Sequence, residues 1–371
     1  MAGLKFNRDR VAAIITLLPS IILLAIFVYG FIYKTSYSSL TDWKGLAKDP
    51  ELNFIGLENY KQLFTGLLDI RFRQSLVNTF YFTLFFLTGC ISLGLIFAIL
   101  LDQKIRYEGF FRMIFLYPMA LSFIVSGTVW RWLFNPMGGV NRLPALLNLE
   151  PLKFKWLTDR SQIWQFSWLQ LPTFFGYALV IVLVVLAFRY KNNGELWKAW
   201  LVTGVGALTS IWLVSGGAEK IQIISYPEKH GFNLAMVGII IAATWQMAGY
   251  VMAMYLAGIR GIPEELREAA RVDGANEFQV YHQIILPILK PITLSAMIVL
   301  GHISLKIFDL IFVMTGPDNS STDVPGTLMF VTSFRGNEFA KGAAIATVML
   351  IMVALVIVPY LVNTLRSEHE L

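Results

Sequence analysis

The chain contains few charged residues and almost no cysteine. Asp, Glu, Lys and Arg make up 15% of its 371 residues, whereas soluble domains contain roughly 25%. Hydrophobic residues make up 56%, and the mean hydropathy is +0.61. So few charges would not cover a water-exposed surface, which excludes a typical cytosolic enzyme and a disordered tail protein. The single cysteine, Cys90, excludes an internal disulfide framework and a cysteine metal cluster.

The sequence also lacks the common motifs of nucleotide-binding and catalytic sites. No glycine is followed directly by lysine, so the Gly-Lys-Ser/Thr phosphate loop is absent. The His-Glu-x-x-His zinc motif and the Gly-x-Ser-x-Gly nucleophile motif are absent too, and the four histidines are scattered along the chain. We therefore predict no catalytic residue, no metal site and no cofactor on this chain. ATP, if it is used, must be hydrolysed by another protein.

Long hydrophobic runs are present instead. A transmembrane helix needs about 20 mostly apolar residues, and the segments that meet this requirement are 11–33, 76–101, 113–134, 171–188, 199–215, 233–259, 288–314 and 339–363. We therefore predict an all-α polytopic membrane protein with about eight transmembrane helices. The first run is longer than the apolar core of a signal peptide, which has about 7–15 residues. We interpret it as a retained anchor.

The net charge of +6 is interpreted as a sign of membrane orientation rather than of nucleic-acid binding. If the N-terminus is cytoplasmic, the loops on that side contain Lys and Arg at a higher density than the outer loops. This is the bias that the positive-inside rule describes. Both termini and the loop 260–290 are then predicted to face the cytoplasm.

A polar segment, 261–291, separates two of the apolar runs and has the local signals of two short helices. Pro263 suits a first helical position, and the two glutamates that follow it favour the positive end of a helix. Gly274 can end this helix because glycine tolerates a positive φ. A second helix is predicted over 276–285, interrupted by Pro287. The segment is too polar to span, so we predict a helix–turn–helix at the cytoplasmic membrane surface.

The order of residues in this segment resembles a known motif. Glu268-Ala269-Ala270, three residues, Gly274, nine residues, and Ile284-x-Leu286-Pro287 resembles the EAA loop of binding-protein-dependent ABC importer permeases. The motif has fixed spacing over a long segment, so it is more specific than a lone glycine motif. The extension Asp273-Gly274-Ala275 is similar to the carbohydrate-uptake group, typified by the maltose transporter permeases. The alternative is an ordinary amphipathic helix at the membrane interface.

The resemblance implies a transport subunit that does not itself hydrolyse ATP. The chain would form the translocation path for a sugar, polyol or related polar solute in a bacterial or archaeal plasma membrane, surrounded by lipid. Its partners would be ATPase subunits that hold ATP and Mg, a second permease subunit and an extracytoplasmic solute-binding protein; no nucleic acid is implied. The EAA-like loop would dock on the ATPase, and the residues that would form or flank the dock are Glu264, Arg267, Glu268, Ala269, Ala270, Arg271, Asp273, Gly274, Ile284, Leu286 and Pro287.

The resemblance also suggests how the chain is divided. We expect an N-terminal anchor helix with an outer loop in 1–75, the permease domain in 76–363 and a cytoplasmic tail in 364–371. Permeases of this group commonly have six spans, so 171–232 is interpreted as an inserted helix pair. Two inserted spans leave the EAA-like loop on the cytoplasmic side, whereas one would move it outside.

Two of the apolar runs contain residues that could face the translocation path, namely Trp245, Gln246, Tyr250, His302, Lys306 and Asp309. The last three have i, i+4 and i+7 spacing and would share one stripe of a continuous helix. Ionisable residues inside a membrane usually face a bundle interior or a water-filled path. A structural ion pair between Lys306 and Asp309 is an alternative, as is plain helix packing for the aromatic residues. Trp130, Arg131 and Trp132 are interpreted as an anchor at the outer interface rather than a substrate site.

Two other functions compete with the importer permease. A secondary carrier would use an ion gradient through His302, Lys306 and Asp309. An integral membrane transferase would need clustered acids or a metal site on a loop. The acids of the outer loops show no recognisable catalytic spacing, so the transferase is the weakest alternative.

Overall fold

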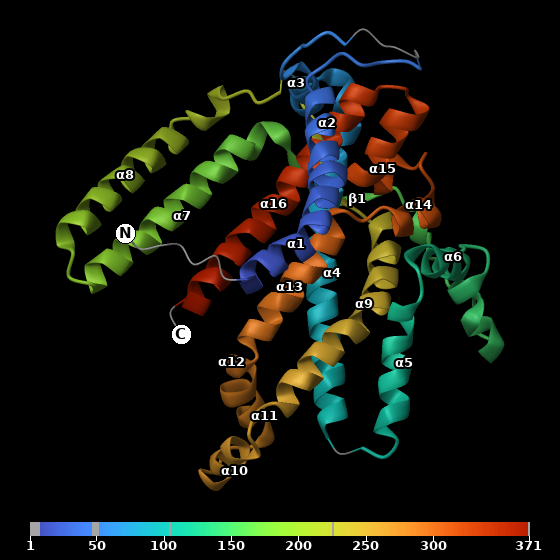
Figure 1. Ribbon diagram of the computed structural model, residues 1–371, viewed down its shortest axis with the longest axis vertical. Coiled ribbons are helices and arrows are strands. Elements are labelled where there is room, and N and C mark those ends of the chain that lie inside the picture. Colours follow the sequence, from blue (N-terminus) through green and yellow to red (C-terminus); the bar gives the residue numbers. More distant parts are fainter. Residues whose placement is uncertain (1–7, 47–51, 104, 225, 370–371) are drawn as a thin grey trace. The chain divides into compact units, whose positions relative to one another are not determined.

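The computed structural model describes residues 8–46, 52–103, 105–224 and 226–369. The contacts divide the chain into two compact units. One unit combines both ends of the chain, Met1–Lys61 with Pro325–Leu371, and the other is the continuous segment Gln62–Val324. Helices dominate both units, and the described residues contain one small two-stranded sheet (Figure 1). The all-α class predicted from composition is confirmed.

The terminal unit consists of long apolar helices. α1 (Arg8–Leu24) and α2 (Gly30–Ser38) are joined by a π-helical turn, so the first apolar run stays helical. α2 packs against α16 (Phe339–His369), and α15 (Pro325–Phe330) precedes α16. The backbone of α16 is helical through His369, so the segment predicted as a tail begins as helix; residues 370–371 of that prediction lie outside the described residues. α3 (Glu58–Thr65) begins in this unit and ends in the other.

The central unit is built around α4 (Ile70–Asp102) and α9 (Ala235–Arg260), which pack along each other (Figure 1). Small residues permit the close approach, because a Cβ added at Gly94 would lie 2.7 Å from the Val251 side chain. Gly249 of α9 similarly faces the backbone of Phe115 with no room for a Cβ. α9 is therefore the most deeply buried of the candidate spans.

Six helices of the described residues are long and apolar enough to cross a membrane, or up to eight if each of two bent helix pairs counts as one span. The predicted span 113–134 is one of these pairs. α5 (Glu108–Ala120) and α6 (Phe123–Leu133) meet at 100°. The bend occurs because Leu121 and Ser122 are extended, and the Ser122 hydroxyl then accepts a hydrogen bond as the N-cap of α6.

The predicted span 288–314 is wrong as a single helix. α13 (Lys290–Leu305) bends by 64° from the helical segment Glu277–Ile288 that precedes it. α13 then ends, and α14 (Asp309–Thr315) is a separate short helix. The backbone of Phe308, with φ −137° and ψ −62°, lies outside the helical region and separates the two helices.

The region interpreted as an insertion contains two helices. α7 (Leu171–Asn192) and α8 (Leu196–Val214) form a hairpin that stands apart from α4 and α9 in Figure 1. The strands β1 (Gln162–Ser167) and β2 (Lys229–Asn233) flank the hairpin and pair antiparallel, with Phe166 opposite His230. The chain therefore enters and leaves the hairpin at one place.

Candidate functional site

The EAA-like loop forms the predicted helix–turn–helix. α10 (Glu264–Val272) ends before Gly274, whose φ is +89°, a conformation that favours glycine. α11 (Glu277–Val280) begins with a capping box, in which Asn276 accepts a hydrogen bond from the Gln279 N–H and the Gln279 side chain accepts one from the Asn276 N–H. A π-helical turn continues α11 to Ile285. The bend between the helices is therefore fixed by local chemistry.

The two prolines behave differently from the prediction. Pro263 is the N-cap of α10, one residue before the first helical position, with an extended ψ of 133°. Pro287 does not interrupt the second helix. It lies in α12 (Leu286–Ile288), which continues the helical segment Glu277–Ile288 directly after the π-helical turn, and the chain bends only at Leu289.

One surface of the loop is exposed and includes apolar side chains. The motif residues Glu268, Ala269 and Gly274 are exposed, and their docking on another protein stays a prediction. Val272 and Phe278 are 87% and 77% exposed. Apolar residues at the end of a polar helical turn are typical of a surface that another protein covers. We name Ala269, Val272 and Phe278 the docking face.

The opposite surface of the loop is fastened to α4. Arg267, predicted to flank the dock, is instead buried and donates to Asp102 Oδ2 at 2.9 Å and to the Ile259 carbonyl at 2.9 Å. The Tyr281 hydroxyl donates to the same Asp102 oxygen at 3.0 Å. One carboxylate at the end of α4 therefore holds both helices of the loop. Sequence reasoning missed Asp102, since it lies far from the motif along the chain.

Exposed ion pairs join the two helices directly. Arg271 of α10 donates to Glu277 of α11 at 2.7 Å and lies 3.4 Å from Glu264. The hydrogen bond to Glu277 is the main cause that raises the pKa of Arg271 above its ordinary value. Exposed pairs of this kind contribute little to stability, so the buried Asp102 contacts are the stronger constraint.

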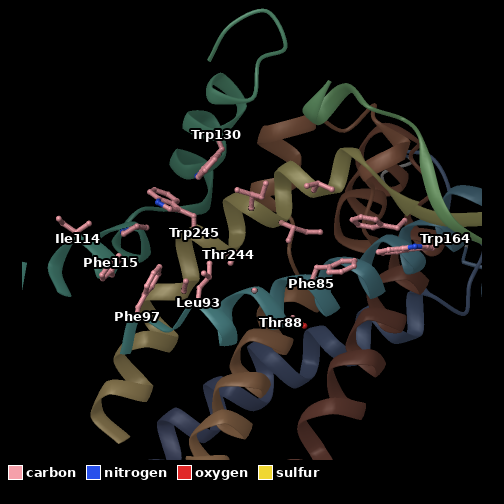
Figure 2. A pocket seen from close by; sticks show the side chains of 18 residues that line it. Phe85, Thr88, Leu93, Phe97, Ile114, Phe115, Trp130, Trp164, Thr244 and Trp245 are labelled. Atoms are coloured by element: carbon pink, nitrogen blue, oxygen red, sulfur yellow. The ribbon is translucent and has the colours of Figure 1, made fainter. Parts of the chain in front are cut away.

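An apolar cavity of about 800 Å³ lies between α4, α5, α6 and α9 (Figure 2). Aromatic side chains from different segments line it, including Phe85, Phe97, Trp130 and Trp164. Trp245, predicted to face the path, also lines the cavity and packs edge-on against Trp130 with ring centroids 5.6 Å apart. Trp130 is half-buried in this contact, whereas Trp132 is 69% exposed, and the interpretation of the two as an outer anchor stays a prediction.

The remaining residues predicted for the path do not line this cavity. Gln246 is buried, and its amide donates to the Leu121 carbonyl at 2.8 Å, so it supports the bend between α5 and α6. Tyr250 is half-buried. A role of Gln246 and Tyr250 in the translocation path stays a prediction.

The stripe expected for His302, Lys306 and Asp309 does not form, because the helix ends at Leu305. His302 is half-buried, whereas Lys306 and Asp309 are exposed. Within the continuously described segment 226–369, no ion pair joins Lys306 to Asp309. The three residues therefore lack the geometry of a continuous relay.

A second polar cluster, which the sequence did not predict, lies where the ends of the hairpin α7–α8 meet α4. Arg73 of α4, with 1% of its side chain exposed, donates to Glu228 Oε2 at 2.8 Å. His230 Nε2 lies 3.1 Å from Glu228 Oε1, and the Trp168 indole N–H donates to His230 Nδ1 at 2.6 Å. Burial, reinforced by the charge of Arg73, lowers the pKa of His230 to about 4, while burial raises the pKa of Glu228. A neutral histidine accepts the hydrogen bond from Trp168 at Nδ1, and its other ring nitrogen lies beside the Glu228 carboxylate.

Metal binding has no structural support in the described part of the chain. No group of three or more His, Cys, Asp or Glu side chains there could hold a metal ion.

Comparison with known proteins identifies what the chain is similar to. Residues 152–367 match the family described as the binding-protein-dependent transport system inner membrane component. A probable ABC transporter permease of Pyrococcus horikoshii is 37% identical over 99% of this chain and 100% of its own length. A xylose/arabinose import permease of Haloferax volcanii is 32% identical over 92% of this chain and 84% of its own length.

A solved structure is similar in fold. It is that of a bacterial alginate ABC transporter in complex with a periplasmic protein that holds an alginate pentasaccharide. The match has a TM-score of 0.60 and 19% identity, and it covers 94% of this chain and 93% of the other.

Proposed function

Because the chain belongs to the family of binding-protein-dependent transport system inner membrane components, we propose that it is the permease subunit of an ATP-driven importer of a sugar or related polar solute. The observation that carries this proposal is the exposed docking face on a loop that Asp102 fastens to α4. A loop that couples ATP hydrolysis to transport needs one surface that contacts the ATPase and another that is fixed to a transmembrane helix. The EAA-like loop has both.

The ATPase is proposed to be a separate protein. The chain lacks a phosphate-binding Gly-Lys-Ser/Thr loop, so ATP and Mg would be held by the ATPase partner. Closure of that partner would push on Ala269, Val272 and Phe278, and the force would reach α4 through Arg267 and Asp102. The loop then faces the cytoplasm of a bacterial or archaeal cell.

The proposed solute is hydroxyl-rich. A relative at 32% identity is named a xylose/arabinose import permease, and the central cavity is lined by aromatic rings such as Trp130 and Trp245. Aromatic rings with few polar groups suit the apolar faces of sugar rings. A solute-binding protein on the outer side would complete the importer, as the family description implies. A second permease subunit would form the path together with this chain.

An exposed substitution on the docking face tests the proposal. Ala269→Arg places a charged side chain at an exposed position without disturbing a buried contact. We expect a roughly tenfold or greater loss of ATPase activity stimulated by the loaded binding protein, because central interface positions contribute at least about 2 kcal/mol. The measurement is ATP hydrolysis and solute uptake by the assembled complex in proteoliposomes.

Asn193→Arg is the matched control. It adds the same side chain at an exposed position in the turn between α7 and α8, outside the loop, and we expect normal stimulation. Normal stimulated hydrolysis in the Ala269→Arg complex would contradict docking at this face. Uptake by this chain alone, driven by an ion gradient in liposomes, would favour a secondary carrier instead.

A further inference from the structure

A crevice of about 550 Å³ separates the two helices of the hairpin α7–α8. Its walls are mostly apolar and come from both helices, with Val180 and Leu183 on α7 and Ala207 on α8. The helices approach closely at the other end of the hairpin, where Gly176 contacts the Leu213 side chain and has no room for a Cβ. The crevice therefore lies between this close approach and the turn that joins the two helices, and we call it the wedge.

The wedge has the length of one membrane leaflet. Its lining extends along α7 from Val180 to Lys191, which is about 16 Å at a rise of 1.5 Å per residue. Half of the hydrocarbon core of a bilayer is about 15 Å thick. Both helices qualify as membrane spans, and their outer faces carry exposed Phe175 and Leu208. A hydrocarbon chain that lies in the crevice would therefore extend along about one leaflet.

The end of the wedge nearest the turn is basic, and we expect it at the depth of lipid headgroups because both candidate spans end there. Lys191 lines this end, and its ammonium has no ion-pair partner among the described residues. The nearby acid Glu195 is already paired with Lys198. Trp200 also lines this end and is 75% exposed, as expected for a tryptophan at the membrane–water interface.

We propose that the crevice between α7 and α8 binds one anionic phospholipid, with an acyl chain in the wedge and the phosphate against Lys191. Basic pockets between transmembrane helices on the cytoplasmic side recognise anionic headgroups in this way. The bound lipid fills a space that the two helices alone leave open. The inserted pair thus acts as a lipid-binding hairpin of the permease.

Retention of lipid by the purified full-length chain tests this assignment. The chain is incubated with mixed vesicles of phosphatidylglycerol and phosphatidylcholine in equal amounts, and the lipids that stay bound are counted by native mass spectrometry. We expect the wild type to retain phosphatidylglycerol in preference to phosphatidylcholine. Lys191→Gln should reduce that preference about fivefold, the effect of one basic residue at a membrane surface.

Two further variants distinguish a specific lipid-binding site from an effect of general surface charge and from misfolding. Arg189→Gln removes a basic residue on the same helix that does not line the crevice, and it should keep the wild-type preference. Ala207→Phe fills the wedge from an exposed position, and it should reduce retention of both lipids. Equal retention of the two lipids by the wild type, or equal losses in Lys191→Gln and Arg189→Gln, would overturn the proposal.

Discussion

Several partners surround the most deeply buried arginine among the described residues. This is Arg73, whose guanidinium donates to Glu228, to the Tyr226 hydroxyl and to the backbone carbonyls of Leu63 and Gly66. An unpaired buried charge would cost several kcal/mol. Each guanidinium nitrogen has an acceptor here, so a charge at the end of a membrane helix is compatible with a stable fold.

His230 makes this cluster sensitive to acid. Its pKa of about 4 in the folded chain lies below the ordinary value of 6.5. The unfolded chain therefore binds a proton between about pH 6.5 and pH 4, and the folded chain does not. As the pH is lowered from about 6.5 to about 4, the free energy of unfolding should therefore decrease by about 3 kcal/mol. The raised pKa of Glu228 acts in the opposite direction, because the folded carboxyl takes up its proton earlier as the pH falls.

A substitution isolates the contribution of the histidine. His230→Gln retains an acceptor for the Trp168 N–H and a donor toward Glu228 but does not titrate. We expect the thermal midpoint of the detergent-purified wild type to fall more steeply between pH 6.5 and pH 4 than that of the variant. Parallel pH profiles for the two proteins would show that His230 is not the titrating group.

At the scale of the helices, the EAA-like loop depends on a residue outside it. Asp102 lies at the end of α4 and accepts from Arg267 of α10 and from Tyr281, which follows α11. The local signals of capping and glycine define each short helix, but they do not determine where the pair lies. Asp102 is a positioning residue for the loop.

Asp102→Asn should uncouple the transporter rather than unfold it. The amide keeps an acceptor for Arg267 but loses the charge, and a buried arginine without its carboxylate costs about 3–5 kcal/mol locally. We expect binding-protein-stimulated ATPase activity of the complex to fall at least several-fold while unstimulated hydrolysis persists. Asp102→Glu should restore part of the stimulation, because it returns the charge.

Asp42→Asn is a suitable comparison for this variant. Asp42 is a half-buried carboxylate far from the loop in sequence that accepts hydrogen bonds from the backbone and side chain of Asn53, and its loss should leave coupling unchanged. Equal stimulation in Asp102→Asn and Asp42→Asn would show that Asp102 does not position the loop.

At the scale of the whole molecule, the hairpin α7–α8 is a separable part of the central unit. Its two helices pack mainly against each other, and β1 and β2 bring its ends together at Ser167 and Lys229. Trp168 and Glu228 continue this pairing through a backbone hydrogen bond of 3.1 Å. The hairpin supplies two candidate spans, so its loss removes an even number of membrane crossings.

Replacing 171–225 with a short Gly/Ser linker should therefore preserve the topology of the rest of the chain. The paired strands already place the two ends within reach of a tight turn. We expect Ala269→Cys to be labelled by a membrane-impermeant thiol reagent from the same side of the membrane with and without the hairpin. The native Cys90 is buried and gives a low background. Labelling from opposite sides would contradict the assignment of two spans.

The sequence by itself determined the class of the protein and the identity of its most informative loop. Hydrophobic runs must be helical in a membrane, because lipid offers no partner to backbone N–H and C=O groups, and the composition was sufficient to predict this. The spacing from Glu268 to Pro287 is local, so the helix–turn–helix and its bend at Gly274 were also predictable. The positions of Pro263 and Pro287 were not, because a proline can stand before a helix, as Pro263 does, or inside one next to a π-helical turn, as Pro287 does.

Only the tertiary structure decided which residues meet across the chain. Asp102 and Arg267, or Arg73 and Glu228, are separated by more than a hundred residues in sequence, and no periodicity relates them. The break after Leu305 likewise separates residues that a continuous helix would place on one stripe. Periodicity describes one helix at a time, whereas the pairing of buried charges depends on how several helices pack, and that packing creates the site.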